Sequence, residues 1–198
     1  ATAGIGESFS RLLASNRYNI VLVARDLPRL QERAQGLEAK YGVQTHVIQA
    51  DLATDEGCLK IEEYIAENQI DVLINNAGII QPFVPIKDLT IQQAEKVMNV
   101  NFYGPFTLIK AFLPGLLARP EAHILNVSSM GAYAPVPGQS VYGASKAAIK
   151  LLTEGLRSEL MGTNVGVTVV FPGAVATNIT TNSGLAMPDV DVDSSNEW

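Results

Sequence analysis

Two residues of the sequence have the types and the spacing for proton transfer. Tyr142 and Lys146 lie four positions apart in a stretch with the pattern of a helix, and residues four apart share one helix face. A tyrosine hydroxyl ionises near a pKa of about 10, so acid/base work near neutral pH requires a neighbouring positive charge. One ammonium about 4 Å away supplies about 4 kcal/mol at an effective dielectric of about 20, which is enough. The same spacing also occurs by chance on ordinary helices, so the pair needs support from elsewhere.

That support comes from three segments in which an apolar run ends in polar or turn residues. Residues 71–78 read DVLINNAG, residues 124–129 read ILNVSS and residues 171–177 read FPGAVAT. In parallel sheets, ligands bind beyond the carboxyl ends of the strands. We therefore expect these segments to gather at one edge of a sheet, together with Tyr142 and Lys146.

Short β-branched runs alternate with longer amphipathic stretches along the chain. The strands are near-continuous apolar runs, which is typical of a sheet covered on both faces. Strands separated by helices indicate parallel βαβ units, and so an α/β, Rossmann-type, doubly wound parallel sheet with helices on both faces. We expect strands at residues 20–24, 45–49, 71–75, 122–128 and 165–171, and helices at 28–40, 55–68, 89–117, with a break near Pro105, and 141–161.

The sequence opens on a glycine-containing turn. Gly4 and Gly6 precede an amphipathic stretch, and glycines at a strand-to-helix turn let the backbone approach a phosphate at the helix N-terminus. A G-x-G pair alone is weak evidence, because glycine pairs are common in plain turns. No strand precedes this turn, and the first glycine of a dinucleotide fingerprint is missing. We therefore expect an N-terminally trimmed version of a longer protein, with the central strand of the sheet among the lost residues.

Arg25 follows the first expected strand at the position where a Rossmann strand meets the ribose of a dinucleotide. An acidic residue there would bind the ribose 2′-hydroxyl and select NAD. Here the small Ala24 precedes a guanidinium, an arrangement that admits and pairs a 2′-phosphate, so NADP is favoured over NAD. The alternative is that Arg25 is a solvated surface residue beside Asp26.

Length and composition limit the classes of protein to consider. The 198 residues suffice for a single domain over residues 1–198, of which about 178–198 are expected to form a substrate lid or mobile tail, with a loop or tail from Thr180. A formal net charge of −6 argues against nucleic acid and anionic membrane surfaces as partners, since both require basic patches. No apolar run is long enough to span a bilayer. A single cysteine, Cys58, is typical of a reducing, cytoplasmic compartment.

No metal site is expected. His46 and His123 lie near strand starts, far apart in the sequence and without ligand-like spacing, and are interpreted as structural or surface residues. Cys58 lies in an acidic helical stretch without a nearby base, so a reactive role is not expected.

Taken in order, the motifs resemble those of the short-chain dehydrogenase/reductase family, in its main, non-extended branch. Each motif alone is modest evidence, whereas the ordered and correctly spaced set, covering residues 1 to about 179, is strong evidence. The matching segments are AGIG at 3–6, Asp51-Leu52, NNAG at 75–78, NVNFYG at 99–104, NVSS at 126–129, YGASK at 142–146 and PGAVAT at 172–177. The family usually continues with a further helix and strand that finish the sheet and the substrate pocket, and this C-terminal segment is expected to be missing.

The resemblance implies how the catalytic residues divide their work. Tyr142 would exchange a proton with the substrate oxygen, and Lys146 would stabilise the phenolate and bind the nicotinamide ribose. Ser129 would hold the carbonyl oxygen, with Ser128 as the less favoured neighbour. A second asparagine motif, NVNFYG, would support the lysine through a water-linked proton path, by way of Asn101 or, as the less favoured alternative, Asn99.

The resemblance also implies a dinucleotide site along the same sheet edge. The pyrophosphate would lie at the glycine turn, the adenine beside the Asp-Leu pair, the ribose beside NNAG and the nicotinamide at the Pro-Gly turn. The residues implied are Gly4, Ile5, Gly6, Asp51, Leu52, Asn75, Ala77, Gly78, Pro172, Gly173, Val175 and Thr177, together with Arg25, Tyr142 and Lys146.

The function implied is hydride transfer between NADP(H) and a hydrophobic carbonyl compound or secondary alcohol. Apolar residues near the motifs suit such a substrate, or could equally pack the lid against the body. They are Ile79, Ile80, Met130, Tyr133, Val136, Ile179, Leu185 and Met187. A homodimer or homotetramer is also implied, with the helices at 89–117 and 141–161 as the dimer face. Five small residues would allow close helix contact there or against the sheet: Gly143, Ala144, Ala147, Ala148 and Gly155.

Two other functions compete with this hypothesis. A cofactor-binding regulatory or scaffolding protein could use the same fold, because fold does not fix function. The retained set of Asn101, Ser129, Tyr142 and Lys146 argues against it. A sugar-nucleotide epimerase of an extended relative fits worse, because the chain is short and shows no second substrate domain.

Overall fold

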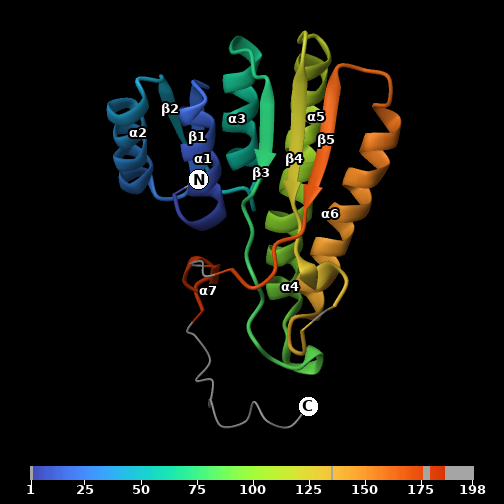
Figure 1. The fold of residues 1–198 in the computed structure, drawn as a ribbon. Coiled ribbons are helices and arrows are strands. Elements are labelled where there is room, and N and C mark those ends of the chain that lie inside the picture. Colours follow the sequence, from blue (N-terminus) through green and yellow to red (C-terminus); the bar gives the residue numbers. More distant parts are fainter. Residues whose placement is uncertain (1, 135, 176–178, 186–198) are drawn as a thin grey trace.

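The computed structural model describes residues 2–134, 136–175 and 179–185 (Figure 1). Its strands are β1 (Ile20–Ala24), β2 (Thr45–Gln49), β3 (Val72–Asn75), β4 (Ala122–Val127) and β5 (Val165–Val170). Its α-helices are α1 (Gly4–Ser15), α2 (Leu27–Tyr41), α3 (Asp55–Glu67), α4 (Ile91–Met98), α5 (Gly104–Leu117), α6 (Ser140–Glu159) and α7 (Ile179–Asn182). Two 3-10 turns, η1 (Ile86–Asp88) and η3 (Met130–Ala132), and a π-helical segment, η2 (Asn99–Tyr103), complete the order.

Every strand pairing is parallel, which confirms the expected α/β architecture. β1 pairs with β2, and β3, β4 and β5 form a second sheet in that order. Helices α1 and α2 pack on each other and on the first sheet, while α3 packs on β2 and α5, and α5 and α6 pack on the second sheet. Parallel strands joined by helical crossovers place the helices on both faces, as in Rossmann-type folds. The chain is therefore doubly wound, as predicted.

Side-chain caps set where several helices begin. Asp26 accepts from the backbone N–H of Arg29 at the start of α2, and Thr54 accepts from that of Gly57 at the start of α3. These bonds satisfy donors that an unfinished helical turn leaves free. The cap position of α6 is different, because the Gln139 side chain there accepts no hydrogen bond from the helix.

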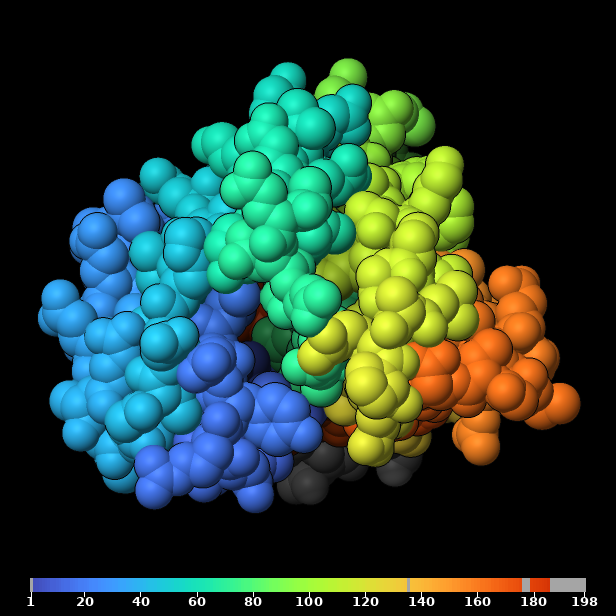
Figure 2. All heavy atoms as spheres, turned by 90° about the horizontal axis from the view of Figure 1, so that it is seen from above, coloured from blue at the N-terminus to red at the C-terminus, as the bar shows by residue number. Residues whose placement is uncertain are grey.

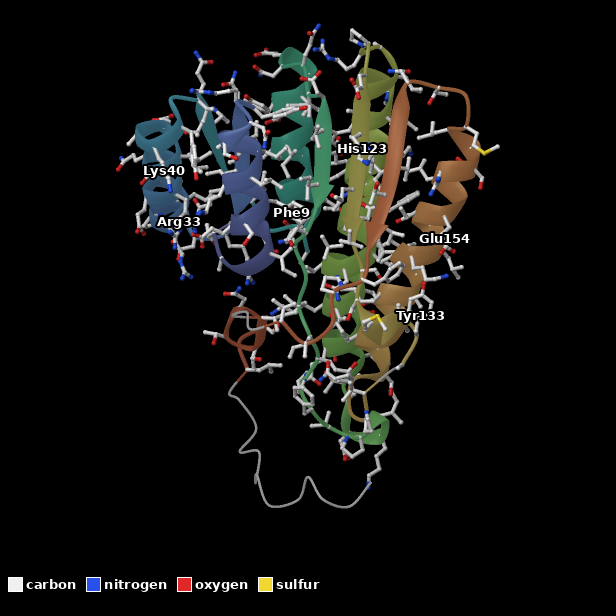
Figure 3. All side chains as sticks on the ribbon, viewed as in Figure 1. Phe9, Arg33, Lys40, His123, Tyr133 and Glu154 are labelled. Atoms are coloured by element: carbon white, nitrogen blue, oxygen red, sulfur yellow. The ribbon has the colours of Figure 1, made fainter. Side chains whose placement is uncertain are left out.

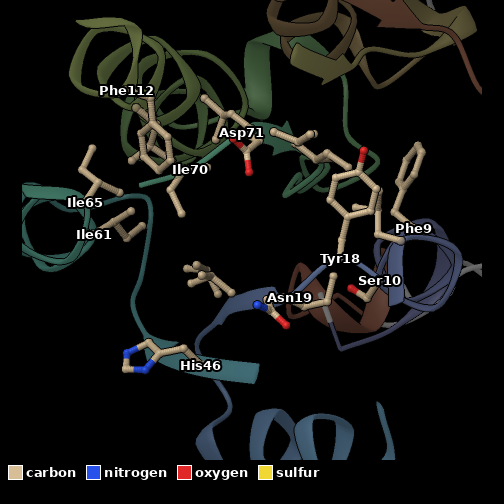
Figure 4. A pocket seen from close by; sticks show the side chains of 18 of the residues that line it. Phe9, Ser10, Tyr18, Asn19, His46, Ile61, Ile65, Ile70, Asp71 and Phe112 are labelled. Atoms are coloured by element: carbon tan, nitrogen blue, oxygen red, sulfur yellow. The ribbon is translucent and has the colours of Figure 1, made fainter. Parts of the chain in front are cut away.

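The two sheets are separated by a cleft of about 750 Å³. Seen from above, the surface is hollowed between the N-terminal segment and the segment that carries β3 (Figure 2). Val23 of β1 and Leu73 of β3 line the cleft from its two sides. Phe9 of α1, Ile61 of α3 and Phe112 of α5 surround it in Figure 4. Among the described residues, no strand pairs with both β1 and β3, which belong to different sheets.

The sequence predicts a break in the helix near Pro105, but the structure has a π-helical segment there instead. Helical structure continues through Ile91–Met98, the π-helical Asn99–Tyr103 and Gly104–Leu117. Proline has no N–H, so Pro105 cannot donate to the carbonyl of Asn101 four residues back. A π-helical segment immediately before it widens the turn without ending the helix.

The predicted loop or tail from Thr180 is also wrong at its start. Residues 179–182 form α7, which Figure 1 shows beyond the carboxyl ends of β3 and β5. The end of α7 is tied to the body, because the Arg25 guanidinium donates to the carbonyl of Asn182 at 2.7 Å and the N–H of Ile80 donates to Ser183 Oγ at 2.9 Å. Residues 186–198, which include Met187, lie outside the described residues. No helix in the described ranges is long and apolar enough to cross a membrane.

We predict that the cleft accepts one added parallel strand. A segment of five Val and Ile residues, joined to Ala1 by a glycine turn, would lie in the cleft between β1 and β3 and bury its side chains there. Burial gives about 1.5–3 kcal/mol per side chain against an ordering cost of about 1–2 kcal/mol per residue. We expect the free energy of unfolding in urea to rise by about 2 kcal/mol or more. A matched segment with two prolines, which cannot donate to a ladder, should give no increase; equal stability of both fusions would contradict the prediction.

Candidate active site

A buried lysine lies at the centre of the site. The Lys146 side chain is 4% exposed, and its Nζ donates to the carbonyl of Val127, the last residue of β4, at 3.0 Å. Burial lowers the pKa of Lys146 from 10.5 to about 8, because desolvation disfavours the charged form. The ammonium is therefore still the main form at neutral pH. Its Nζ lies 5.9 Å from the centre of the Tyr142 ring, so the predicted proximity of the two side chains is observed.

Polar contacts fasten α6 to the end of β4. The Ser128 hydroxyl, 3% exposed, donates to the backbone carbonyl of Lys146 at 2.8 Å. Deeper in the sheet, the amide of Asn75 donates to Asn126 Oδ1 at 2.8 Å, and Asn126 Nδ2 donates to Thr153 of α6 at 2.9 Å. Buried polar groups keep a fixed geometry when their partners are satisfied. These bonds fix the position of α6 along β4. They therefore also fix where Lys146 lies relative to the end of the strand.

The two serines at the strand end are now distinguished. Ser128 is committed to the backbone of α6, whereas Ser129 is half-buried and its Oγ accepts from the N–H of Gly131 at 3.0 Å. A methyl group on Gly131 would lie 3.4 Å from Ser129 Oγ and 3.4 Å from the edge of the Tyr142 ring. Ser129 and Tyr142 therefore flank the same small volume. This geometry favours Ser129 over Ser128 for contact with a substrate oxygen.

Asn101 joins the segment after β3 to helix α6. Its side chain is 1% exposed, accepts from the N–H of Ile79 and donates to the carbonyl of the same residue, both at 2.9 Å. It also donates to Ser145 Oγ at 3.0 Å. The amide thus holds the strand end and α6, and among the described residues no hydrogen bond joins it to Lys146. The water-linked proton path stays a prediction.

Gly78 lies against the lysine. A Cβ at this position would lie 3.2 Å from Lys146 Nζ, a tight contact, and 3.5 Å from Asn101 Oδ1, an ordinary one. A side chain at the end of the NNAG turn would therefore require the buried ammonium to shift by a few tenths of an ångström.

The Asp51-Leu52 pair forms a packed turn at the expected place. The Asp51 carboxylate accepts from the N–H of Ala53 at 3.0 Å. A Cβ on Gly57 would lie 1.9 Å from the Asp51 carbonyl oxygen, and one on Gly104 would lie 2.7 Å from that of Leu52. These two glycines let α3 and α5 press on the turn; sequence reasoning missed them, because their signal is a contact between distant segments. Adenine contact by the turn stays a prediction.

The other predicted cofactor residues fall into three groups. Gly4, Ile5 and Gly6 form the first turn of α1, so the glycines are the start of the helix and not a loop before it. Ala77 is exposed at the strand end, but the side chain of Asn75 is buried against Asn126 and acts as a brace.

The third group is the Pro-Gly turn after β5. The carbonyl of Pro172 accepts from the N–H of Met130, which ties this turn to the segment after β4. Gly173 and Val175 are exposed and available to a ligand. Thr177 lies outside the described residues.

Arg25 and its neighbour Asp26 follow the carboxyl end of β1, where the sequence predicts the choice between dinucleotides to be made. Arg25 is exposed at the end of β1 and contacts α7 through Asn182. The Asp26 carboxylate accepts from the N–H of Arg29 and is therefore used as a helix cap. Because its carboxylate is used in this cap, Asp26 is not free to bind a ribose hydroxyl.

Apolar side chains surround the mouth of the site, with one correction. Met130, Tyr133 and Val136 are about half exposed beside α6, and Tyr133 is labelled in Figure 3. Ile79 was predicted to line the substrate site but is 5% exposed and packs with Val97 in the core. Ile79 contributes to the site through its backbone N–H and carbonyl, which bond to the Asn101 side chain.

The remaining predicted structural residues behave as expected. His46 stacks on Tyr64, and His123 Nε2 lies 2.8 Å from Thr168 Oγ1. No cluster of metal-ligating side chains occurs within the described part of the chain. Burial, Glu62 and Asp55 raise the pKa of the Cys58 thiol, which makes it a poor nucleophile.

The sequence matches the family described as short chain dehydrogenase over residues 1–187. With this match, the parallel fold and the Tyr-Lys-Ser arrangement, the chain belongs to the short-chain dehydrogenase/reductase family. It is 35% identical over 189 residues to "Dehydrogenase/reductase SDR family member 7B" of Mus musculus, an alignment covering 92% of this chain and 58% of the mouse protein. The chain therefore spans less than two thirds of that relative.

Two solved structures are similar over most of the chain. The short-chain dehydrogenase from Sphingobium yanoikuyae in complex with NADPH has a TM-score of 0.88 and 32% identity, covering 100% of this chain and 75% of that one. The bulky-bulky ketone specific alcohol dehydrogenase from Comamonas testosteroni has a TM-score of 0.83 and 32% identity, covering 88% of this chain and 70% of that one.

The lowered pKa of Lys146 predicts a specific dependence of stability on pH. Between about pH 8 and 10.5 the unfolded chain holds a proton on this lysine that the folded protein has lost, so the free energy of unfolding rises with pH in that window. Relative to Lys146→Met, the wild type should gain on the order of 3 kcal/mol across it. Urea unfolding of both proteins without added cofactor measures this difference. A difference that stays flat or shrinks as the pH rises would contradict burial of the ammonium.

Proposed function

We propose that this protein is an NADP(H)-dependent oxidoreductase that reduces a carbonyl, or oxidises a secondary alcohol, on a hydrophobic small molecule. The observation that carries the proposal is the buried Lys146 ammonium beside Tyr142, with Ser129 facing the same small volume. A buried cation next to a tyrosine of α6 and a serine after β4 is costly, and it suits proton transfer at a substrate oxygen.

The residues present fit a nicotinamide dinucleotide. The Gly78 backbone lies close to Lys146, whose Nζ would be 3.2 Å from a Cβ there, and Gly173 has open space around it. These positions let backbone and ammonium approach a ribose and a nicotinamide ring. When bound, the cofactor supplies or accepts the hydride.

The protein's own part in the reaction is positional and electrostatic. Ser129 donates a hydrogen bond to the substrate carbonyl oxygen and polarises it. Tyr142 donates its hydroxyl proton to that oxygen as the carbonyl carbon is reduced, and takes it back in the oxidation direction. Lys146 stabilises the phenolate that remains. The oxygen thus gains its proton from a group already held beside it.

NADP(H) as the preferred cofactor rests on Arg25 and Asp26. The guanidinium stands free of any carboxylate in the described ion pairs, and can exchange its bond to the carbonyl of Asn182 for a 2′-phosphate. Asp26 is occupied as a cap. The relative from Sphingobium yanoikuyae binds NADPH, which supports the same choice here.

A hydrophobic substrate and self-association extend the proposal. The exposed Met130, Tyr133 and Val136 at the mouth of the site suit an apolar substrate.

Tyr103 and Phe106, at the junction of η2 with α5, are also about half exposed, as a dimer face formed by the long helices would require. Light scattering that shows only a monomer would contradict the homodimer or homotetramer.

Replacing Tyr142 by phenylalanine tests the acid/base role. Loss of the hydroxyl removes the proton donor, so we expect kcat for NADPH-dependent ketone reduction to fall by about 10²–10⁴-fold, while NADPH affinity by fluorescence changes less than about threefold. The matched control is Tyr41→Phe, because this tyrosine ends α2 and packs against the apolar cluster of the first sheet, and its kcat should stay within about twofold. Equal activity of Tyr142→Phe and wild type would remove the proposed mechanism. NADPH binding without turnover of any ketone or aldehyde would favour the regulatory alternative.

Replacing Arg25 by alanine tests the cofactor preference. A lost phosphate contact should weaken NADPH binding by about ten- to a hundredfold, as expected for a charge-assisted contact of about 1.5–3 kcal/mol. The NADH affinity should stay within about twofold. Arg157→Ala, which removes an exposed cation from the last turn of α6, controls for net charge and should change neither affinity. Isothermal titration with both dinucleotides measures the ratio, and a wild-type preference for NADH would overturn the assignment.

A further inference from the structure

The first turn of α6 is capped by a residue from a distant loop. Gln81 follows β3 in the chain, and its side chain is 1% exposed. Its amide oxygen accepts from the backbone N–H groups of Val141 at 2.8 Å and Tyr142 at 3.0 Å. Its amide nitrogen donates to the carbonyl of Gly138 at 2.9 Å. One buried side chain therefore makes three hydrogen bonds to the segment that begins α6.

These contacts replace the cap that the helix would ordinarily supply itself. Cap side chains accept from the second or third N–H of a helix, and Val141 and Tyr142 hold those positions in α6. Gln139, at the cap position, instead donates from Nε2 to the backbone carbonyl of Gln81 at 2.8 Å. The helix start is thus bound by side chains to the loop after β3, while its preceding turn contributes the backbone bond from the N–H of Gln139 to the carbonyl of Val136.

As a result, the backbone of Tyr142 is fixed on both sides. Its N–H is held by Gln81, and its carbonyl accepts from Ser145 Oγ at 2.7 Å. Ser145 in turn accepts from Asn101, which also holds Ile79 two residues before Gln81. The tyrosine backbone, the strand-end loop and the π-helical segment therefore form one closed set of hydrogen bonds.

We propose that Gln81 is a positioning residue for Tyr142, acting through the backbone of the tyrosine and not by contact with substrate. The proposal rests on the proposed function, because it assigns Gln81 a role in the proton transfer made by that tyrosine. Proton transfer requires the donor within hydrogen-bond reach of the acceptor, and small displacements of a reacting group reduce the rate steeply. Loss of the cap frees the first turn of α6 and lets the hydroxyl drift from the substrate oxygen.

The test compares two buried glutamines, Gln81 after β3 and Gln139 at the start of α6, which bond the same two segments together. Gln81→Met removes the cap, whereas Gln139→Met removes only the bond to the Gln81 carbonyl, together with an Oε1 atom that has no hydrogen-bond partner among the described residues. We expect Gln81→Met to lower kcat by tenfold or more with KM for NADPH within threefold. We expect Gln139→Met to leave kcat within threefold. A protonated glutamate has the shape and the hydrogen-bonding pattern of glutamine here, so Gln81→Glu should recover most of kcat at mildly acidic pH.

Amide hydrogen exchange tests the contact without any turnover. Exchange at Val141 and Tyr142 should accelerate tenfold or more in Gln81→Met and stay unchanged in Gln139→Met. Unchanged exchange in Gln81→Met would overturn the cap itself. Faster exchange with unchanged kcat, an equal loss of kcat in both methionine variants, or no recovery in a folded Gln81→Glu would overturn the positioning role. If the wild type reduces no ketone or aldehyde, the proposed function fails and the positioning role falls with it, while the exchange data still decide whether the cap exists.

Discussion

One buried cation constrains the rest of the site. Taking the Lys146 ammonium out of water disfavours its charged form, and its pKa falls to about 8. The bond from Nζ to the carbonyl of Val127 offsets part of that cost and fixes the ammonium at the end of β4. Its neighbours adjoin this position: a Cβ at Gly78 would lie 3.2 Å from Nζ, and Tyr142 lies one helical turn away on the same face. The catalytic geometry is thus a consequence of where β4 and α6 meet.

Buried amides and hydroxyls determine that meeting point. An apolar interface between a strand and a helix tolerates sliding, whereas hydrogen bonds are lost if the elements shift by one residue. Asn126 links the neighbouring strand to α6, and Asn101 links the strand-end loop to α6 through Ser145. Their replacement by apolar residues would leave partners unsatisfied inside the core. The polar groups therefore specify the register that the apolar core alone would leave open.

Much of this arrangement could be predicted from the sequence. Apolar runs predicted the strands to within one residue at each end, and the motif order indicated the residues that we propose to be catalytic. What the sequence could not provide is contact between distant segments. Gln81 has no local signal, since its three partners lie near residue 140, and the glycines at 57 and 104 are explained only by the turn at Asp51. Pro105 was read as a break because the π-helical accommodation of a missing N–H depends on the packing around it. The expected central strand corresponds to a cleft in the described residues.

The proposed site delivers a hydride to a carbonyl carbon of a hydrophobic substrate. The most direct measurement of this is the transfer of deuterium from NADPH, labelled at C4 of the nicotinamide on either face, to a panel of bulky apolar ketones, read by mass spectrometry of the alcohol product. We expect one deuterium on the carbinol carbon, delivered from one face of the cofactor only. Tight binding of the labelled NADPH with no deuterium in any product from either face would contradict it.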